Sequence, residues 1–120
     1  MGIGYGVKEP TVEVRWPRSD VAHVVLRGEH DLASVSTLAG QLANALAKSV
    51  HLIVDVSEAS FVDSTTIRAI VASKHEAHLS ERRFNLLVGT AAIVEMALDL
   101  SGVLPALNTV RSVDEALADG

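Results

Sequence analysis

The alternation of apolar and polar residues predicts a pair of strands near the N-terminus. Apolar and charged side chains alternate from Thr11 to Trp16, which is the period of a half-buried strand. A turn cluster at residues 17–20 follows, and residues 22–27 form a second apolar run. The two runs and the turn between them predict an antiparallel hairpin. Residues 1–10 contain three glycines and no periodicity, so they predict a flexible N-terminal arm.

Beyond the hairpin, helical and strand patterns alternate along the chain. Apolar residues at helical spacing predict helices over 33–48, from Ser64 onward, and from Thr90 to about Gly102. Short apolar runs predict buried strands at 51–56 and 84–88, a shorter strand at 107–110, and a capping box that opens a last helix at 112–115. This order predicts one α/β domain over 11–120, with a mixed sheet of about five strands, an antiparallel edge at the N-terminus, and about four helices.

Composition excludes several classes of function. The 120 residues fit one domain, and the absence of cysteine excludes disulfides, thiolate metal sites and cysteine nucleophiles. A net charge of -5 and only 3% aromatic residues argue against binding to nucleic acid. The opening residues lack the features of a signal peptide, and no apolar stretch is long enough to span a membrane. We therefore expect a cytoplasmic protein without membrane insertion.

The segment from Asp55 to Ile67 is the most informative candidate site. A buried strand ends there, a short loop follows, and a helix begins with Ser64 as a candidate N-cap. Backbone N–H groups converge at a helix N-terminus, and the helix dipole favours an anion there. A phosphate on this hydroxyl would add a charge of about -1.5 to -2 beside Asp63. Ser64 is thus either a plain helix cap or a site of modification.

Three short motifs together resemble the STAS domain family, the bacterial anti-sigma factor antagonists. Asp63-Ser64-Thr65, preceded by Ser60-Phe61-Val62, is similar to the family's phosphorylation signature. The segment 28–34 resembles the element that ends the second strand of the family, and the segment 100–104 resembles its late Ser-Gly-Leu turn. The resemblance covers nearly the whole chain from Thr11 onward.

The resemblance implies a switch in protein binding. Ser64 matches the serine that an anti-sigma factor, a kinase with a histidine-kinase-like ATPase fold, phosphorylates. The unphosphorylated form would bind the anti-sigma factor and release a sigma factor, and a serine phosphatase would reset the phosphorylated form. ATP would belong to the kinase, so no cofactor is expected in this chain. The partner-binding surface would comprise Asp31, Asp63, Ser64, Thr65, Thr66 and Arg68.

Thr66 departs from the family pattern, which has a glycine at this position. Because a β-branched side chain is larger than glycine, a partner that packs against this helix would need a matching recess. The same resemblance also allows a second function, that of a subunit which docks on a transporter ATPase. In that case the serine need not be phosphorylated.

An enzyme or a metal site finds less support in the sequence. Ser64 lacks the Gly-x-Ser-x-Gly frame of a hydrolase nucleophile. His75 and His78 lie three residues apart on a predicted helix, but no His-Glu-x-x-His frame accompanies them, which favours a solvated helix face. His30 lies between two acidic residues and is expected in an exposed loop. The sequence therefore predicts a binding protein that is not an enzyme, a monomer or a weak dimer.

Overall fold

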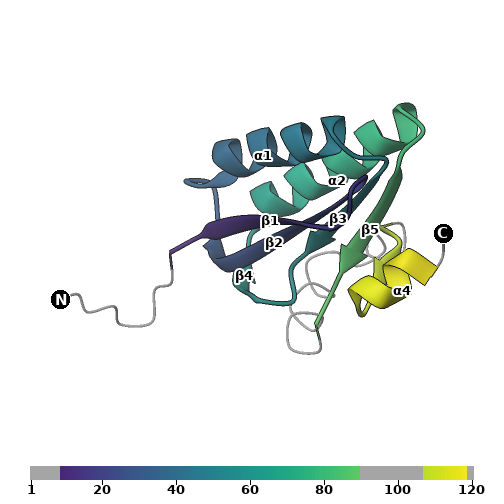
Figure 1. Ribbon diagram of the computed structural model, residues 1–120. Helices are drawn as coiled ribbons and strands as arrows, with labels where there is room; N and C mark the ends of the chain where they lie inside the picture. The colour runs from purple at the N-terminus through teal and green to yellow at the C-terminus, as the bar shows by residue number, and fades with distance from the viewer. Residues whose placement is uncertain (1–8, 90–106, 119–120) are drawn as a thin grey trace.

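The structure, a computed structural model, describes residues 9–89 and 107–118. The predicted third helix, the motif at 100–104 and most of the predicted arm lie outside these residues. In chain order (Figure 1) the elements are β1 (Thr11–Arg18), β2 (Val21–His30), α1 (Val35–Ala47), β3 (His51–Asp55), β4 (Ala59–Val62), α2 (Ser64–Leu79), β5 (Arg83–Leu87), β6 (Thr109–Val110) and α4 (Val113–Ala118).

The strands form a mixed sheet, as the sequence predicts. The strand order is β1-β2-β3-β5-β6, with β4 paired to β2 beside this path. β1 pairs antiparallel with β2, and the other pairs are parallel. This confirms an α/β domain with an antiparallel edge. The sequence missed β4, because only Val62 of its four residues is buried and so short a strand has no apolar periodicity.

Helices α1 and α2 lie side by side on one face of the sheet (Figure 1). Successive side chains of a strand point to opposite faces, so every second residue of the central strands meets these helices. Each fully buried aliphatic side chain contributes about 1.5–3 kcal/mol to folding. This main core includes Val24, Leu26, Leu52, Val54 and Leu86 from the strands, Leu38 and Leu42 from α1, and Ile67 and Ile70 from α2.

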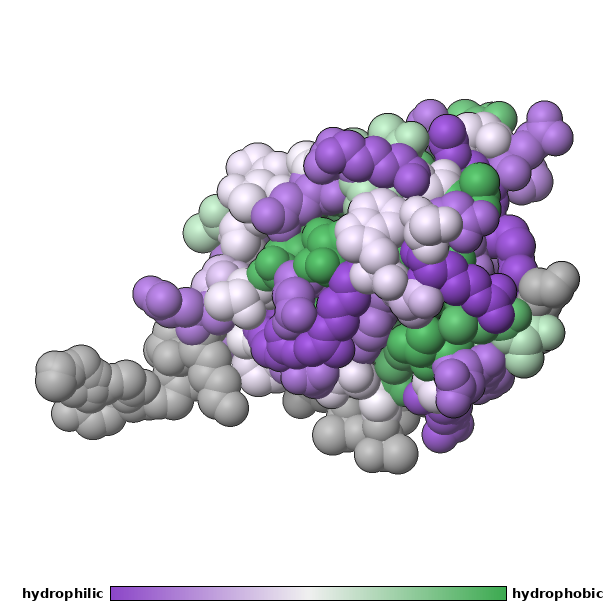
Figure 2. All heavy atoms as spheres, in the orientation of Figure 1, coloured by the Kyte–Doolittle hydropathy of each residue, from purple (hydrophilic) through white to green (hydrophobic). Residues whose placement is uncertain are grey.

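The opposite face of the sheet holds a smaller apolar cluster and several buried polar side chains. Val21, Ile53 and Leu87 pack there against α4 and β6, and hydrophobic surface gathers over α4 in Figure 2. His23, His51, Asp55 and Asn85 are also buried, and all four lie at alternate strand positions shared with this cluster. The edge strand β1 is mostly exposed, and its predicted half-buried character is wrong because most of its residues lie beyond the cover of the helices.

A bulge at Gly28 divides β2 into two parts. Residues 21–25 of β2 pair with β3, whereas residues 28–30 pair with β4, and the register shifts between Gly28 and Glu29. Gly28 has φ 83, a left-handed conformation that glycine adopts without steric cost. β2 continues past the bulge to His30, which pairs with Val62 of β4 and is 1% exposed. The expectation of an exposed loop at His30 is therefore wrong.

The predicted capping box forms at the start of α4. The hydroxyl of Ser112 accepts a hydrogen bond from the Glu115 amide at 3.0 Å. The Glu115 carboxylate accepts one from the Arg111 amide at 2.9 Å, one residue before the usual partner.

Candidate functional site

The candidate site lies where β2 and β4 end side by side. His30 is the register partner of Val62, so Asp31 and Asp63 follow at matching positions on adjacent parallel strands. The Asp63 amide donates a hydrogen bond to the His30 carbonyl at 3.1 Å, which ties the two strand ends together. Asp31 and Asp63 therefore each follow one of two paired residues at the end of adjacent strands.

Asp63, and not Ser64, is the N-cap of α2. Its backbone is extended, with φ -96 and ψ -179, and its Oδ1 accepts hydrogen bonds from the Thr66 amide at 3.0 Å and the Thr65 hydroxyl at 2.7 Å. Burial is the largest single influence and raises the pKa of Asp63, but the hydrogen bonds from Thr65 and Thr66 together hold that pKa below its usual value. The carboxylate is therefore charged at neutral pH, beside Ser64.

The three hydroxyl residues at the start of α2 have different surroundings. Ser64 is exposed, and within the described residues its hydroxyl makes no hydrogen bond. Thr65 is half-buried and donates its hydroxyl proton to Asp63. Thr66 is fully buried, so the expectation that its side chain meets a partner directly is wrong. Among the three, only Ser64 offers an accessible and unengaged oxygen.

Arg68 and Asp31 flank Ser64 on the surface. Arg68 is exposed and lies four residues after Ser64, which places both on the same face of α2, one turn apart. Asp31 is exposed, and its Oδ1 accepts a hydrogen bond from the Ala33 amide at 3.0 Å. Its carbonyl accepts one from the Ser34 amide, also at 3.0 Å, so the turn before α1 is held in place. The surface therefore presents two carboxylates, one hydroxyl and one guanidinium.

Two exposed apolar side chains belong to the same region. Leu32, next to Asp31, is 70% exposed, and Phe61, on β4 two residues before Asp63, is 43% exposed. No role was predicted for either of them from the sequence, although both lie within the segments that resemble the STAS family. Large apolar side chains next to charged groups are typical of protein-binding surfaces, where aromatic residues supply much of the affinity.

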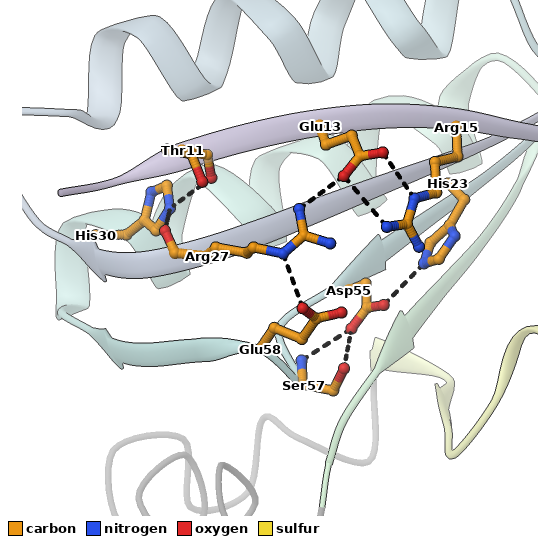
Figure 3. A network of polar contacts seen from close by, with 9 residues as sticks. All are labelled: Thr11, Glu13, Arg15, His23, Arg27, His30, Asp55, Ser57 and Glu58. Atoms are coloured by element: carbon orange, nitrogen blue, oxygen red, sulfur yellow. Dashed lines mark hydrogen bonds and ion pairs between the residues drawn. The ribbon is translucent and has the colours of Figure 1, made fainter. Parts of the chain in front are cut away.

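A buried polar cluster lies on β2, on β3 and in the turn after β3, and it was not predicted from the sequence. Nε2 of His23 donates to Oδ2 of Asp55 at 2.8 Å, and the Ser57 hydroxyl and amide donate to Oδ1 of Asp55 at 2.6 and 2.8 Å (Figure 3). Burial is the largest influence and raises the pKa of Asp55, but the hydrogen bonds from His23 and Ser57 outweigh it and lower that pKa overall. Because Ser57 bonds to the carboxylate and not to the imidazole, this cluster lacks the hydroxyl–imidazole contact of a nucleophilic triad.

Four charged residues, of which three are exposed and Arg27 is half-buried, form a series of ion pairs next to this cluster (Figure 3). Glu13 on β1 pairs with Arg15 at 2.9 Å and with Arg27 of β2 at 2.7 Å, and Arg27 also pairs with Glu58 at 2.8 Å. Hydrogen bonds from Arg15 and Arg27 lower the pKa of Glu13 to about 2. Exposed ion pairs contribute little to stability. The main effect of these ion pairs is therefore to join β1, β2 and the turn before β4.

The described residues were also searched for a metal site and for a membrane-spanning helix. In residues 9–89 and 107–118, no three histidine or acidic side chains gather as a metal site would need. His75 and His78 are both exposed. No helix in the same part of the chain is long and apolar enough to span a membrane.

Comparison with known proteins identifies the family. The STAS domain family matches residues 17–116, so the chain belongs to the STAS domain family. An anti-sigma factor antagonist from Mycobacterium paratuberculosis has a similar structure, with a TM-score of 0.80 and 20% identity over 92% of this chain and 93% of that one. No curated protein sequence matches the chain.

A second solved protein has the same fold. The anti-sigma factor antagonist SpoIIAA in its unphosphorylated form has a TM-score of 0.74 and 18% identity, over 91% of this chain and 95% of that one. The Bacillus cell fate determinant SpoIIAA in its phosphorylated form has a TM-score of 0.67 and 16% identity, over 91% of this chain and 98% of that one.

Proposed function

We propose that this protein is an anti-sigma factor antagonist whose binding is switched by phosphorylation of Ser64. The unphosphorylated chain binds an anti-sigma factor kinase and thereby frees a sigma factor, and a serine phosphatase restores this form. The observation that carries the proposal is the exposed hydroxyl of Ser64, which has no hydrogen bond within the described residues, while Thr65 is engaged and Thr66 is buried. The similarity in fold to solved antagonists supports the same role.

The charges around Ser64 explain how a phosphate would change binding. A phosphate adds about -1.5 to -2 charges next to Asp63 and close to the strand end that bears Asp31. Arg68, one turn along α2, can offset part of this charge in the free protein. In an interface that excludes water, like charges brought together cost several kcal/mol. Each loss of about 1.4 kcal/mol weakens binding tenfold. The phosphorylated form would therefore dissociate.

Identification of the partner tests the proposal first. The tagged wild-type chain is used to capture its partner from a lysate of the source cells, and mass spectrometry identifies the bound ATPase. We expect an anti-sigma factor kinase. Recovery of a transporter ATPase would instead support the docking-subunit function.

The site of modification is tested with the captured kinase and ATP. We expect phosphate on the peptide that contains Ser64, and none after Ser64→Ala. Phosphate on Thr65 in the wild-type chain would contradict the assignment, because that hydroxyl is bonded to the Asp63 carboxylate.

Calorimetry tests the switch. We expect Ser64→Ala to keep the affinity of the wild-type chain and Ser64→Asp to lower it by at least about tenfold. Ser112→Asp is the matched control, because Ser112 also lies at a helix N-terminus but on the far side of the sheet, where aspartate can keep the cap. Equal affinities of Ser64→Asp and the wild-type chain would refute a switch operated by charge. Loss of binding in Phe61→Ser would support the part played by the apolar side chains of the surface.

A further inference from the structure

A pocket of about 330 Å³ opens at the end of the molecule opposite to Ser64. It lies between the last turns of α2, the start of β5 and the start of β6, whereas Ser64 is the first residue of α2. The 16 residues of α2 span about 24 Å. Its polar lining includes Lys74, His78, Arg82, Arg83, Asn85 and Asn108.

The pocket concentrates positive charge in an acidic protein. Three of the ten Lys and Arg residues line it, together with His78, although the net charge of the chain is -5. Among the described residues, no carboxylate lines it. The ion pairs of the described residues involve other side chains, so Lys74, Arg82 and Arg83 have no counter-ion in this part of the chain. Charges of one sign that line a concave surface raise the local concentration of ions of the opposite charge.

Hydrogen bonds hold the floor of the pocket in place. Nδ2 of Asn85 donates to the Asn108 carbonyl at 2.9 Å, and Oδ1 of Asn85 accepts from Nε2 of His51 at 2.7 Å. Nδ2 of Asn108 donates to the Phe84 carbonyl at 3.3 Å. The floor is therefore formed before any ligand arrives, which lowers the entropic cost of binding.

The backbone turn after α2 fixes the two arginines at the rim. The Arg82 amide donates to the Ala77 carbonyl at 2.7 Å and the Glu81 amide to the His78 carbonyl at 3.1 Å, which is the pattern of a Schellman turn. Glu81 takes the left-handed conformation that such a turn requires, with φ 59, where glycine is usual. Asn108, on the other side of the pocket, has φ 53, and these two are the non-glycine residues with positive φ in the described ranges.

We propose that this pocket binds a small phosphorylated compound with two or more negative charges, such as a diphosphate or a bisphosphate. The guanidinium groups of Arg82 and Arg83 can each donate two parallel hydrogen bonds to phosphate oxygens, and Lys74 adds a third positive charge. A pocket of about 330 Å³ fits a small molecule. Because the pocket and Ser64 are at opposite ends of α2, this binding is separate from the proposed switch.

Titration of the full-length chain with pyrophosphate, followed by amide NMR spectra and calorimetry, tests the proposal. We expect saturable binding, with shifts at the amides of Arg82, Arg83 and Asn108. We expect Arg82→Gln combined with Arg83→Gln to weaken it at least tenfold. If that variant does not fold, Lys74→Gln serves in its place and should weaken binding severalfold.

A matched control removes the same charge elsewhere. Arg15→Gln combined with Arg111→Gln takes two exposed cations from other surfaces and should leave pyrophosphate binding unchanged. Ser64→Ala should also bind as the wild-type chain does, whether or not Ser64 is a phosphorylation site. Shifts that do not saturate, equal weakening by the control, or equally tight binding of citrate would each overturn the proposal.

Discussion

Replacement of Asp55 by valine is expected to destabilise the fold strongly. Asp55 is 4% exposed and His23 is 6% exposed, so water reaches neither partner of this 2.8 Å contact freely. Valine would leave three donors without their acceptor: Nε2 of His23 and the amide and hydroxyl of Ser57. Loss of one partner from a buried pair costs about 3–5 kcal/mol. We expect a loss near the lower end of that range, because Ser57 is half-buried and water can replace part of its hydrogen bonding.

The double variant His23→Leu with Asp55→Val should recover the part of this loss that comes from the unpaired His23 side chain. Position 23 lies beside Ile53, and position 55 lies beside Val25, on adjacent strands, so apolar side chains would extend the apolar cluster of this face. Replacement of a buried polar pair by apolar groups of similar size is often neutral or stabilising. The two substitutions should therefore be strongly non-additive, with a coupling energy of about 2 kcal/mol or more.

Urea unfolding followed by circular dichroism measures these free energies at pH 7. An unfolding midpoint of Asp55→Val equal to that of the wild-type chain would refute the reasoning, and so would losses that simply add in the double variant.

The pH dependence of stability provides a second measurement of the same carboxyl group. The pKa of Asp55 is lowered by folding, so its contribution is present above its unfolded pKa, about 4, and is lost as the pH falls through the lower folded value. The difference in stability between the wild-type chain and Asp55→Val should therefore shrink below about pH 4. A difference in unfolding free energy between the two proteins that stays constant down to pH 2 would contradict this role of the Asp55 carboxylate.

Two further predictions concern the backbone that positions the site. Gly28→Ala should cost about 1–2 kcal/mol, because φ 83 at this bulge is unfavourable for a residue with a Cβ. Its control, Gly40→Ala, should stabilise by about 0.5–1 kcal/mol, since Gly40 lies within α1 with open space around it. Asp63→Ala should cost about 0.5–2 kcal/mol at pH 7 through loss of the helix cap. Because folding lowers the pKa of Asp63, this cost should decline as the pH falls below about 4, and urea unfolding at several pH values measures all three variants.

The sequence predicted the central strands and the helices that cover them, because their apolar residues recur at the periods of strand and helix. It did not predict β4, whose pairing depends on the far end of β2 and on the bulge at Gly28. The burial of His30 has the same origin, since no local pattern shows that β2 continues past the bulge. These features depend on contacts between segments about thirty residues apart, which periodicity does not report.

At the candidate site, local sequence preference alone could not identify the N-cap residue of α2. Asp63 and Ser64 are both favourable N-cap residues, so local preference could not choose between them. The hydrogen bond from the Asp63 amide to the His30 carbonyl keeps Asp63 extended, and the helix therefore begins at Ser64, one residue earlier than a Ser64 cap would give. The burial of Thr66 could have been predicted from helical spacing, because Thr66 lies four residues before the buried Ile70. The acidic residues and Ser64 were found from their motifs.

The division of β2 between two partners has a consequence for the order in which the protein opens. The part of β2 that pairs with β3 is buried on both faces. The part from Gly28 to His30 pairs with β4 through three register pairs, and two of the four β4 side chains are exposed. Native proteins open in segments, and those with few buried contacts open at the lowest free energy. The amides of Phe61 and Val62 should therefore exchange with solvent through local opening, while those of Ile53 and Val54 exchange only when the whole domain unfolds. The surface that carries Ser64 can thus rearrange around a partner, or around a phosphate, while the rest of the sheet stays folded.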